Sequence, residues 1–107
     1  MMHLMWLPDA LADLNEIYDY YLIFNQKIAV GIYNKILDEA ELLPTYPRIA
    51  PREPLLEDAE EEIRSLVVAD GKYKLIYSID DKSVVIIGVF SCRQNPVNLR
   101  VKILQRM

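Results

Sequence analysis

The stretch from Arg64 to Pro96 constrains the fold more than any other part of the chain. It contains three strand-like runs that are separated by short polar segments at Asp70-Gly71 and Asp80–Lys82. Runs of this kind, joined by tight polar turns, are typical of antiparallel strands connected by hairpins. Asp70-Gly71 is a strong two-residue turn signal because both turn positions require positive φ. The segment therefore predicts a three-stranded meander whose last strand ends directly before Arg93.

Each of the three runs has a pattern that indicates its place in the sheet. The first, Arg64–Ala69, is short, and the third, Ser83–Phe90, is apolar on both faces, as expected of a central strand. Gly88 inside the third run predicts a bulge or a close backbone approach. The second run, Lys72–Ile79, alternates between the two faces. One of its faces carries the larger apolar residues Tyr73, Leu75, Tyr77 and Ile79.

The first part of the chain carries helical periodicity. Residues His3–Leu7 form a short, mostly apolar run that suits a strand, and Pro8 fits the first position of a helix, where no N–H is needed. Apolar residues then recur at helical spacing over Pro8–Phe24 and again over Gln26–Leu43, until Pro44 ends the second helix. The gap between these helices is short, so they are expected to pack as an antiparallel hairpin.

The connection from the helices to the meander is rich in proline. Four of the six prolines lie in the range Pro44–Glu62, which favours a stiff crossover over a mobile functional loop. Together, the elements predict a single α+β domain over residues 1–107. The expected arrangement is β-α-α-β-β-β in two layers, with the helix hairpin packed on a mainly antiparallel sheet.

Charge is unevenly distributed along the chain. The net charge of −4 argues against a general nucleic-acid binder. Acidic residues cluster at Glu57–Glu62, whereas residues 92–107 form a basic tail without any acidic residue. In this tail Leu99, Ile103 and Leu104 have helical spacing and predict a short helix. The tail is either an ordinary solvated terminus or a surface that meets an anionic partner.

The residue types exclude most kinds of site chemistry. His3 is the single histidine and Cys92 the single cysteine, so neither a metal site nor an internal disulfide is expected. His3 is expected at the surface or in the first strand, and Cys92 is expected to be a small buried residue. We find no phosphate-binding glycine loop, secretory signal or membrane-spanning run. The chain is therefore expected to act in the cytoplasm without a cofactor.

Two arginines at strand ends are the best candidates for a site. Arg64 begins the first strand of the meander, and Arg93 follows the last one. The planar guanidinium group binds phosphate or carboxylate through two hydrogen bonds, so either residue suits an anionic ligand. Because the first and third strands run parallel, the two arginines are expected to lie far apart and not in one site. For each of them the alternative is a structural ion pair with the acidic segment.

With these elements in this order, the chain resembles the RelE/ParE superfamily of toxins from bacterial toxin–antitoxin modules. The matching segments, which span nearly the whole chain, are WLPDALADLNEIYDYY at 6–21, LLPTYP at 42–47, RSLVV at 64–68, YKLIYSID at 73–80 and VFSCRQNP at 89–96. The resemblance is strongest to the ParE-like branch, whose members are often described as plasmid stabilisation proteins.

This resemblance implies a small toxin that a cognate antitoxin holds inactive by wrapping a flexible segment around it. RelE-like members cut messenger RNA on the ribosome with a cluster of basic residues and a C-terminal tyrosine or similar group, whereas ParE-like members interfere with DNA gyrase. Arg64 and Arg93 match arginines of the superfamily. However, Glu57–Glu62 stand where RNA-cutting members place lysines, and no tyrosine or histidine follows Arg93.

The resemblance therefore favours a ParE-like toxin that binds a protein target such as gyrase rather than an enzyme. The first alternative is a ribosome-dependent mRNA endoribonuclease with Arg64 and Arg93 in its site, and the second is a non-toxic member that only binds its antitoxin. We expect the tail to be packed on the domain, to form a homodimer contact, or to be displaced by the antitoxin. The residues expected to contact a partner are Arg93, Gln94, Asn95, Leu99, Ile103 and Leu104.

Overall fold

The predicted order of helices and strands is confirmed in the computed structural model, which describes residues 1–107. The elements are β1 (His3–Trp6), α1 (Pro8–Leu22), α2 (Gln26–Ala40), the short 3-10 helix η1 (Pro54–Leu56), β2 (Glu62–Val68), β3 (Tyr73–Ile79), β4 (Ser83–Ser91) and α3 (Pro96–Arg106). At most of the element ends, the observed bound differs from the predicted one by a few residues. No helix is long and apolar enough to cross a membrane.

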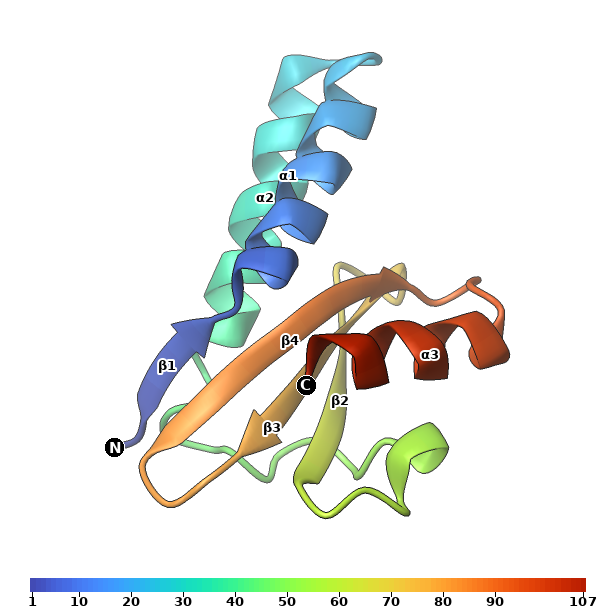
Figure 1. Ribbon diagram of the computed structural model, residues 1–107. Coiled ribbons are helices and arrows are strands. Elements are labelled where there is room, and N and C mark those ends of the chain that lie inside the picture. The colour runs from blue at the N-terminus through green and yellow to red at the C-terminus, as the bar shows by residue number, and fades with distance from the viewer.

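The four strands form one sheet in the order β1-β4-β3-β2. β1 pairs with β4 in parallel, and the other two pairings are antiparallel. β4 is therefore central, as its apolar character on both faces predicts. The α1–α2 hairpin stands over one side of the sheet and extends well beyond it, whereas α3 crosses the sheet on the other side (Figure 1). The predicted α+β class with a helix hairpin on a mainly antiparallel sheet is confirmed, and α3 adds a partial third layer to it.

Each face of the sheet has its own apolar core. On the hairpin side, Leu14 and Ile36 pack with the alternate residues Leu75 and Tyr77 of β3. On the side of α3, the smaller core contains Leu56, Ile63, Ile76, Ile87, Phe90, Leu99 and Ile103. Successive side chains of a strand point to opposite faces, which is why Ile76 belongs to the second core and its neighbours to the first. The tail is therefore packed on the domain, which was one of its three expected states.

β4 contains a β-bulge next to Gly88, where the C-terminal part of α3 approaches the strand. Ile76 pairs with Gly88 whereas Tyr77 pairs with Ile86, so Ile87 is the additional residue on β4. A Cβ atom on Gly88 would collide with the ring of Phe90 and would lie 2.5 Å from Nη1 of Arg106. The predicted bulge is therefore present, and the groups that approach Gly88 closely are side chains.

The turn between β2 and β3 is centred on Asp70-Gly71, and the flanking strands end at Val68 and begin at Tyr73. Three consecutive residues have positive φ, namely Ala69 at 52°, Asp70 at 57° and Gly71 at 85°. Lys72 N donates to the carbonyl oxygen of Ala69 at 3.2 Å across Asp70-Gly71, and β2 and β3 keep the register of a two-residue hairpin with Val68 opposite Tyr73, so the predicted turn is confirmed. The N–H of Ala69 donates to Oε2 of Glu39 at 2.9 Å, and Nζ of Lys35 donates to Oδ1 of Asp70 at 2.7 Å. These contacts attach the turn to α2.

The proline-rich connection is packed against the free edge of β2. Ser65 N donates to the carbonyl oxygen of Pro51 at 3.1 Å, and Glu53 N donates to that of Ile63 at 2.8 Å. The hydroxyl of the buried Tyr77 donates to the carbonyl oxygen of Pro47 at 2.7 Å. The segment therefore protects part of an edge strand and serves as the stiff crossover that its prolines favour.

Candidate functional site

The connection between β4 and α3 holds Arg93 at the surface. The N–H of Cys92 donates to the carbonyl oxygen of Lys72 at 3.0 Å, and Arg93 N donates to Oγ of Ser91 at 3.2 Å. Oδ1 of Asn95 accepts a hydrogen bond from Val97 N at 2.9 Å and caps α3. The backbone on both sides of Arg93 is therefore fixed, and its exposed side chain projects from a rigid support.

Arg93 lines the largest pocket of the molecule, which has a volume of about 560 Å³. The pocket lies where the end of α1 approaches the β2–β3 turn and the end of β4. Its wall is formed by Tyr20, Tyr21, Asp70, Gly71, Lys72, Tyr73, Ser91, Cys92 and Arg93. Cys92 is exposed here, so the prediction of a buried cysteine is wrong. Its position beyond the last residue of β4 takes it out of the core.

Three tyrosines form the apolar wall of this pocket. The rings of Tyr20 and Tyr21 meet edge to face with their centroids 5.1 Å apart. The hydroxyl of Tyr73 lies 3.5 Å from that of Tyr21, and Nζ of Lys72 lies 5.9 Å from the centroid of the Tyr21 ring. Burial, together with the contact with Tyr21, raises the pKa of Tyr73 above its usual value. Tyr73 therefore keeps its proton at neutral pH.

The two cations of the pocket have no acidic partner. Neither the guanidinium of Arg93 nor the ammonium of Lys72 makes an ion pair or a hydrogen bond with the protein. Four other arginines, by contrast, bind carboxylates: Arg48, Arg64, Arg100 and Arg106. The carboxylate of Asp70 also lines the pocket but is paired with Lys35, so Arg93 and Lys72 provide unpaired positive charge beside an aromatic wall. Such a site suits an anionic group that is attached to an apolar one.

A second pocket of about 250 Å³ shares Tyr20, Tyr73 and Ser91 with the first. It continues along β4 toward α3 and is also lined by Gln94 and Lys102. Arg93 and Gln94, both expected to contact a partner, therefore line adjoining hollows. Asn95 has a structural role as the cap of α3.

The apolar tail residues differ in accessibility. Leu99 and Ile103 are buried in the core beneath α3, whereas Leu104 is about half exposed. A partner can reach Leu99 and Ile103 only when α3 leaves the sheet. Their role in binding therefore stays a prediction that depends on displacement of this helix.

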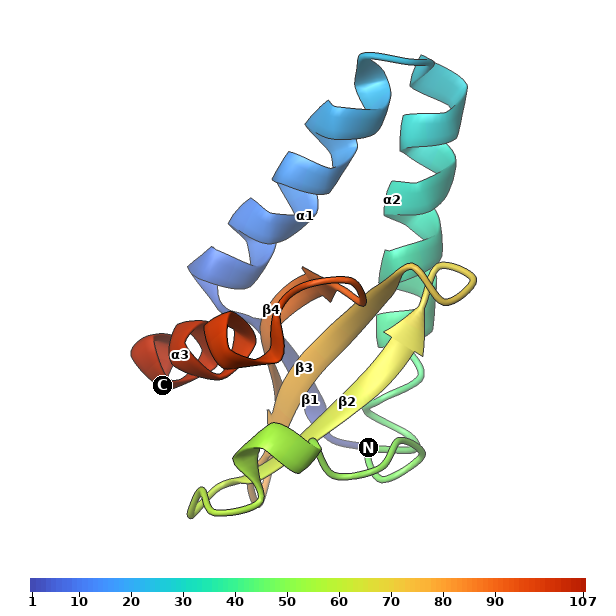
Figure 2. The same cartoon turned by 90° about the vertical axis from the view of Figure 1, so that its right-hand side faces the viewer.

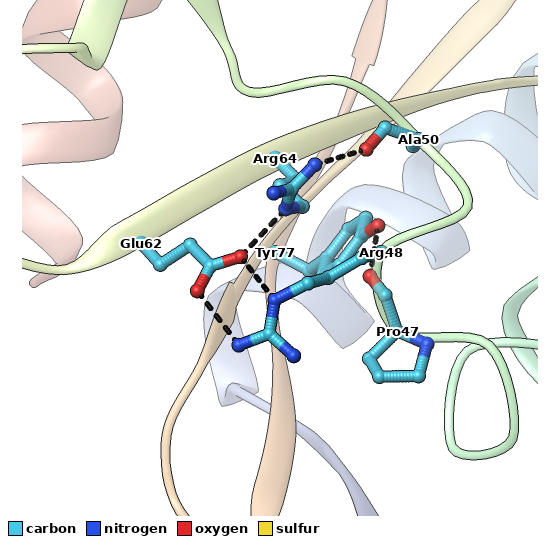
Figure 3. A network of polar contacts seen from close by, with 6 residues as sticks. All are labelled: Pro47, Arg48, Ala50, Glu62, Arg64 and Tyr77. Atoms are coloured by element: carbon cyan, nitrogen blue, oxygen red, sulfur yellow. Dashed lines mark hydrogen bonds and ion pairs between the residues drawn. The ribbon is translucent and has the colours of Figure 1, made fainter.

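Arg64 is part of a separate polar network at the beginning of β2 (Figure 3). Its Nε donates to Oε2 of Glu62 at 2.7 Å, and its Nη1 donates to the carbonyl oxygen of Ala50 at 2.7 Å. Arg48 binds the same carboxylate with two hydrogen bonds of 2.9 and 3.0 Å. Arg64 therefore links β2 to the proline-rich connection. This structural ion pair is the alternative to a role in a functional site that the sequence left open for Arg64.

The two candidate arginines lie at different ends of the sheet. Arg64 stands opposite Tyr77, whereas the last residue of β4 before the Arg93 turn stands opposite Tyr73. Four residues of extended β3 separate these positions, which corresponds to roughly 13 Å along the strand. The expectation that Arg64 and Arg93 do not share one site agrees with this register.

The shared carboxylate of Glu62 makes the fold sensitive to acid. Hydrogen bonds from Arg48 and then Arg64 lower the pKa of Glu62 from 4.5 to about 2. Because the pKa of Glu62 is lower in the folded state than in the unfolded state, its ionised carboxylate stabilises the fold at pH values above 4.5. This contribution is lost as the pH falls from 4.5 to about 2 and Glu62 is protonated. Arg48 is largely exposed, so solvent screens its interaction with Glu62. The expected contribution to the free energy of unfolding is therefore about 2 kcal/mol, less than the whole pKa shift would give.

We therefore expect Glu62→Gln to lower the free energy of unfolding at pH 7 by about 2 kcal/mol and to flatten its decline between pH 5 and pH 2. Urea denaturation at a series of pH values measures both effects. Glu60→Gln, which removes an exposed carboxylate without a partner, is the matched control. Parallel pH profiles for the Glu62→Gln variant and the native protein would contradict the assignment.

Comparisons with known proteins are consistent with this architecture. A family model, described as the ParE toxin of the type II toxin–antitoxin system parDE, matches residues 4–96. No curated protein matches the chain significantly. Among solved structures, the chain is similar to one described as the chromosomal ParDE toxin–antitoxin system from P. aeruginosa, with 22% identity and a TM-score of 0.71. The similarity covers 85% of this chain and 96% of that chain, and at this identity it concerns the fold.

Proposed function

Because the chain belongs to the ParE toxin family of type II toxin–antitoxin systems, we propose that it arrests growth by binding a protein target and that this target is DNA gyrase. A cognate antitoxin neutralises it by covering its surface. In this proposal the Arg93 pocket contacts the target, and residues 1–107 act as one domain.

The observation that carries the proposal is the separation of the two arginines of the superfamily. Cleavage of RNA requires a proton donor, a proton acceptor and positive charge around one phosphate. Arg64 is bound to Glu62 and to the proline-rich connection, at the other end of β3 from Arg93. A single phosphate therefore cannot contact both guanidinium groups, and this supports binding rather than cleavage.

One observation favours ribosome-dependent RNA cleavage as a second candidate. Tyr20, Tyr21 and Tyr73 surround Arg93, although no tyrosine follows Arg93 in the sequence. A protonated tyrosine can donate a proton to a leaving group. However, the raised pKa of Tyr73 makes it a poor proton acceptor. The carboxylate that lines the pocket, Asp70, is a poor base as well, because its hydrogen bond with Lys35 lowers its pKa.

Induction of the chain without its antitoxin tests the proposed function. We expect growth arrest, a loss of negative supercoiling in a reporter plasmid, and no codon-positioned cuts when messenger RNA is mapped by primer extension. Codon-positioned cuts with normal supercoiling would establish the ribonuclease candidate instead. Normal growth of cells that hold folded protein would indicate a non-toxic family member.

We expect Arg93→Gln to weaken binding to purified gyrase about tenfold or more, because a hydrogen bond to a charged group is lost at the interface. The affinity of the native protein should also fall with salt, whereas that of the variant should depend on salt less. Surface plasmon resonance at three salt concentrations measures both quantities. Arg52→Gln, which removes an exposed arginine without an acidic partner, is the control. Equal losses in the two variants would contradict a role for the pocket.

A further inference from the structure

The free end of the helix hairpin carries an exposed apolar patch. The patch consists of Tyr20, Ile23, Phe24 and Ile28, which are 55%, 79%, 66% and 51% exposed. α1 ends at Leu22, so Ile23 and Phe24 belong to the connection between the helices. Oδ1 of Asn25 accepts hydrogen bonds from Lys27 N at 2.8 Å and Ile28 N at 3.2 Å. The patch is therefore held by a capped helix start rather than by a loose loop.

Nothing else in the molecule covers this patch. The hairpin rises from the sheet, and its connecting loop lies at the end farthest from the strands (Figures 1 and 2). Both cores lie at the other end, against the sheet and α3. Large apolar side chains that are exposed together and held rigidly mark a site of interaction with another molecule.

The chain segment that carries most of the patch lacks acidic residues, whereas Glu16 and Asp70 line pockets beside Tyr20 at its base. No acidic residue occurs between Asp19 and Asp38, although the chain contains 16 acidic residues in total. The charged residues in this interval are Lys27 and Lys35. Lys35 is paired with Asp70 of the β2–β3 turn, so Lys27 is the unpaired charge of this segment, on a protein whose net charge is −4.

An aromatic ridge joins the patch to the Arg93 pocket. The ring centroid of Phe24 lies 5.4 Å from that of Tyr20, which in turn lies 5.1 Å from that of Tyr21. Tyr20 and Tyr21 both line the pocket that contains Arg93. Aromatic residues and arginine contribute most of the binding energy at many protein interfaces. The tip and the pocket therefore form one continuous surface, apolar at its far end and cationic at its base.

We propose that this surface docks on the protein target of the toxin, and that the target presents an apolar cleft bordered by carboxylates. The inference rests on the proposed function. Carboxylates at the border of the target's cleft would attract Lys27 and Arg93. They would repel the acidic remainder of the toxin, so the target binds this face in preference to the others. A projecting tip buries its area most fully when it enters a concave site.

The double substitution Phe24→Ser with Ile28→Ser tests the surface. Both residues are exposed, so the variant is expected to fold with an unchanged urea midpoint. We expect growth arrest to disappear at equal expression, and the concentration that half-inhibits purified gyrase to rise about tenfold or more. Val97→Ser, which removes an apolar residue 70% exposed on α3, is the control and should retain full toxicity.

Three results would overturn the inference. The first is growth arrest by the double variant equal to that by the native protein. The second is a loss of antitoxin binding with undiminished growth arrest, which would assign the patch to the antitoxin. The third is a native dimer that the double substitution converts into an equally toxic monomer. If the native protein itself fails to arrest growth, the proposed function fails rather than the placement of the surface.

Discussion

Replacing Asp13 with alanine is expected to lower the free energy of unfolding by about 3 kcal/mol and to release α3 from the sheet. The carboxylate of Asp13 accepts hydrogen bonds from Nη1 and Nη2 of Arg106 at 2.6 and 2.9 Å, and from Val89 N at 3.0 Å. Both side chains of the pair are mostly buried, at 14% and 16% exposure. One residue of α1 thus connects the central strand to the last turn of α3.

The cost is large because the substitution removes the carboxylate that pairs with the mostly buried Arg106 and the acceptor of the Val89 N–H. The Arg106 guanidinium would keep only its 3.1 Å hydrogen bond to the carbonyl oxygen of Ile87 and its position 4.9 Å from the centre of the Phe90 ring. The N–H of Val89 would have no acceptor, and an unpaired buried donor costs about 1–3 kcal/mol. Arg106→Ala should cost less, since Asp13 would still accept the hydrogen bond from Val89.

Urea denaturation and limited proteolysis measure the two expected effects. Asp13→Ala should shift the unfolding midpoint and expose the peptide bonds of α3 to trypsin, while the rest of the domain resists digestion. Asp19→Ala, which removes an exposed carboxylate from the same helix, is the control. An unchanged midpoint together with a protected α3 would show that the ion pair does not anchor the helix.

Replacing Gly88 with alanine is expected to destabilise the domain by about 2–3 kcal/mol. The new Cβ would overlap the Phe90 ring and lie 2.5 Å from Nη1 of Arg106. Neither neighbour can move freely, because Phe90 belongs to the core beneath α3 and Arg106 is bound to Asp13. The strand or α3 must therefore shift, with loss of packing between them.

Gly31→Ala is a matched control for this substitution. No atom lies within 4 Å of a Cβ built on Gly31, which is an exposed residue within α2. Alanine should therefore stabilise the helix by up to about 1 kcal/mol at this position. Opposite shifts of the urea midpoint in the two variants are the expected result. A neutral effect of Gly88→Ala would show that the bulge has room to relax.

The sequence was sufficient to predict the fold because the relevant signals are local. Alternation in β3 and the doubly apolar β4 indicated the meander and the covered place of β4, and Pro8 and Pro44 marked helix ends. The parallel pairing of β1 with β4 was not predicted. The two-residue turn at Asp70-Gly71 was predicted, but its contacts with Glu39 and Lys35 of α2 were not, because these residues are far away in sequence. Side-chain contacts over such distances leave no trace in a local pattern.

The candidate site was predicted only in part, for the same reason. The strand end identified Arg93, but Tyr20 and Tyr21 were assigned to a helix and Tyr73 to the face of a strand. Their meeting around Arg93 depends on how α1 crosses the end of the sheet. The pairing of Arg106 with Asp13, 93 positions apart, was likewise beyond local reasoning. The exposed Ile23 and Phe24 were available as a signal, since both lie at the end of the predicted first helix.

The most direct test of the central claim is a supercoiling assay with purified gyrase and relaxed plasmid, in which the purified chain is titrated. We expect the native protein to inhibit supercoiling in a dose-dependent manner and its antitoxin to reverse this inhibition. The Arg93→Gln and Phe24→Ser/Ile28→Ser variants should inhibit supercoiling more weakly. Undisturbed supercoiling at all concentrations, together with codon-positioned cleavage of messenger RNA on isolated ribosomes, would contradict the central claim.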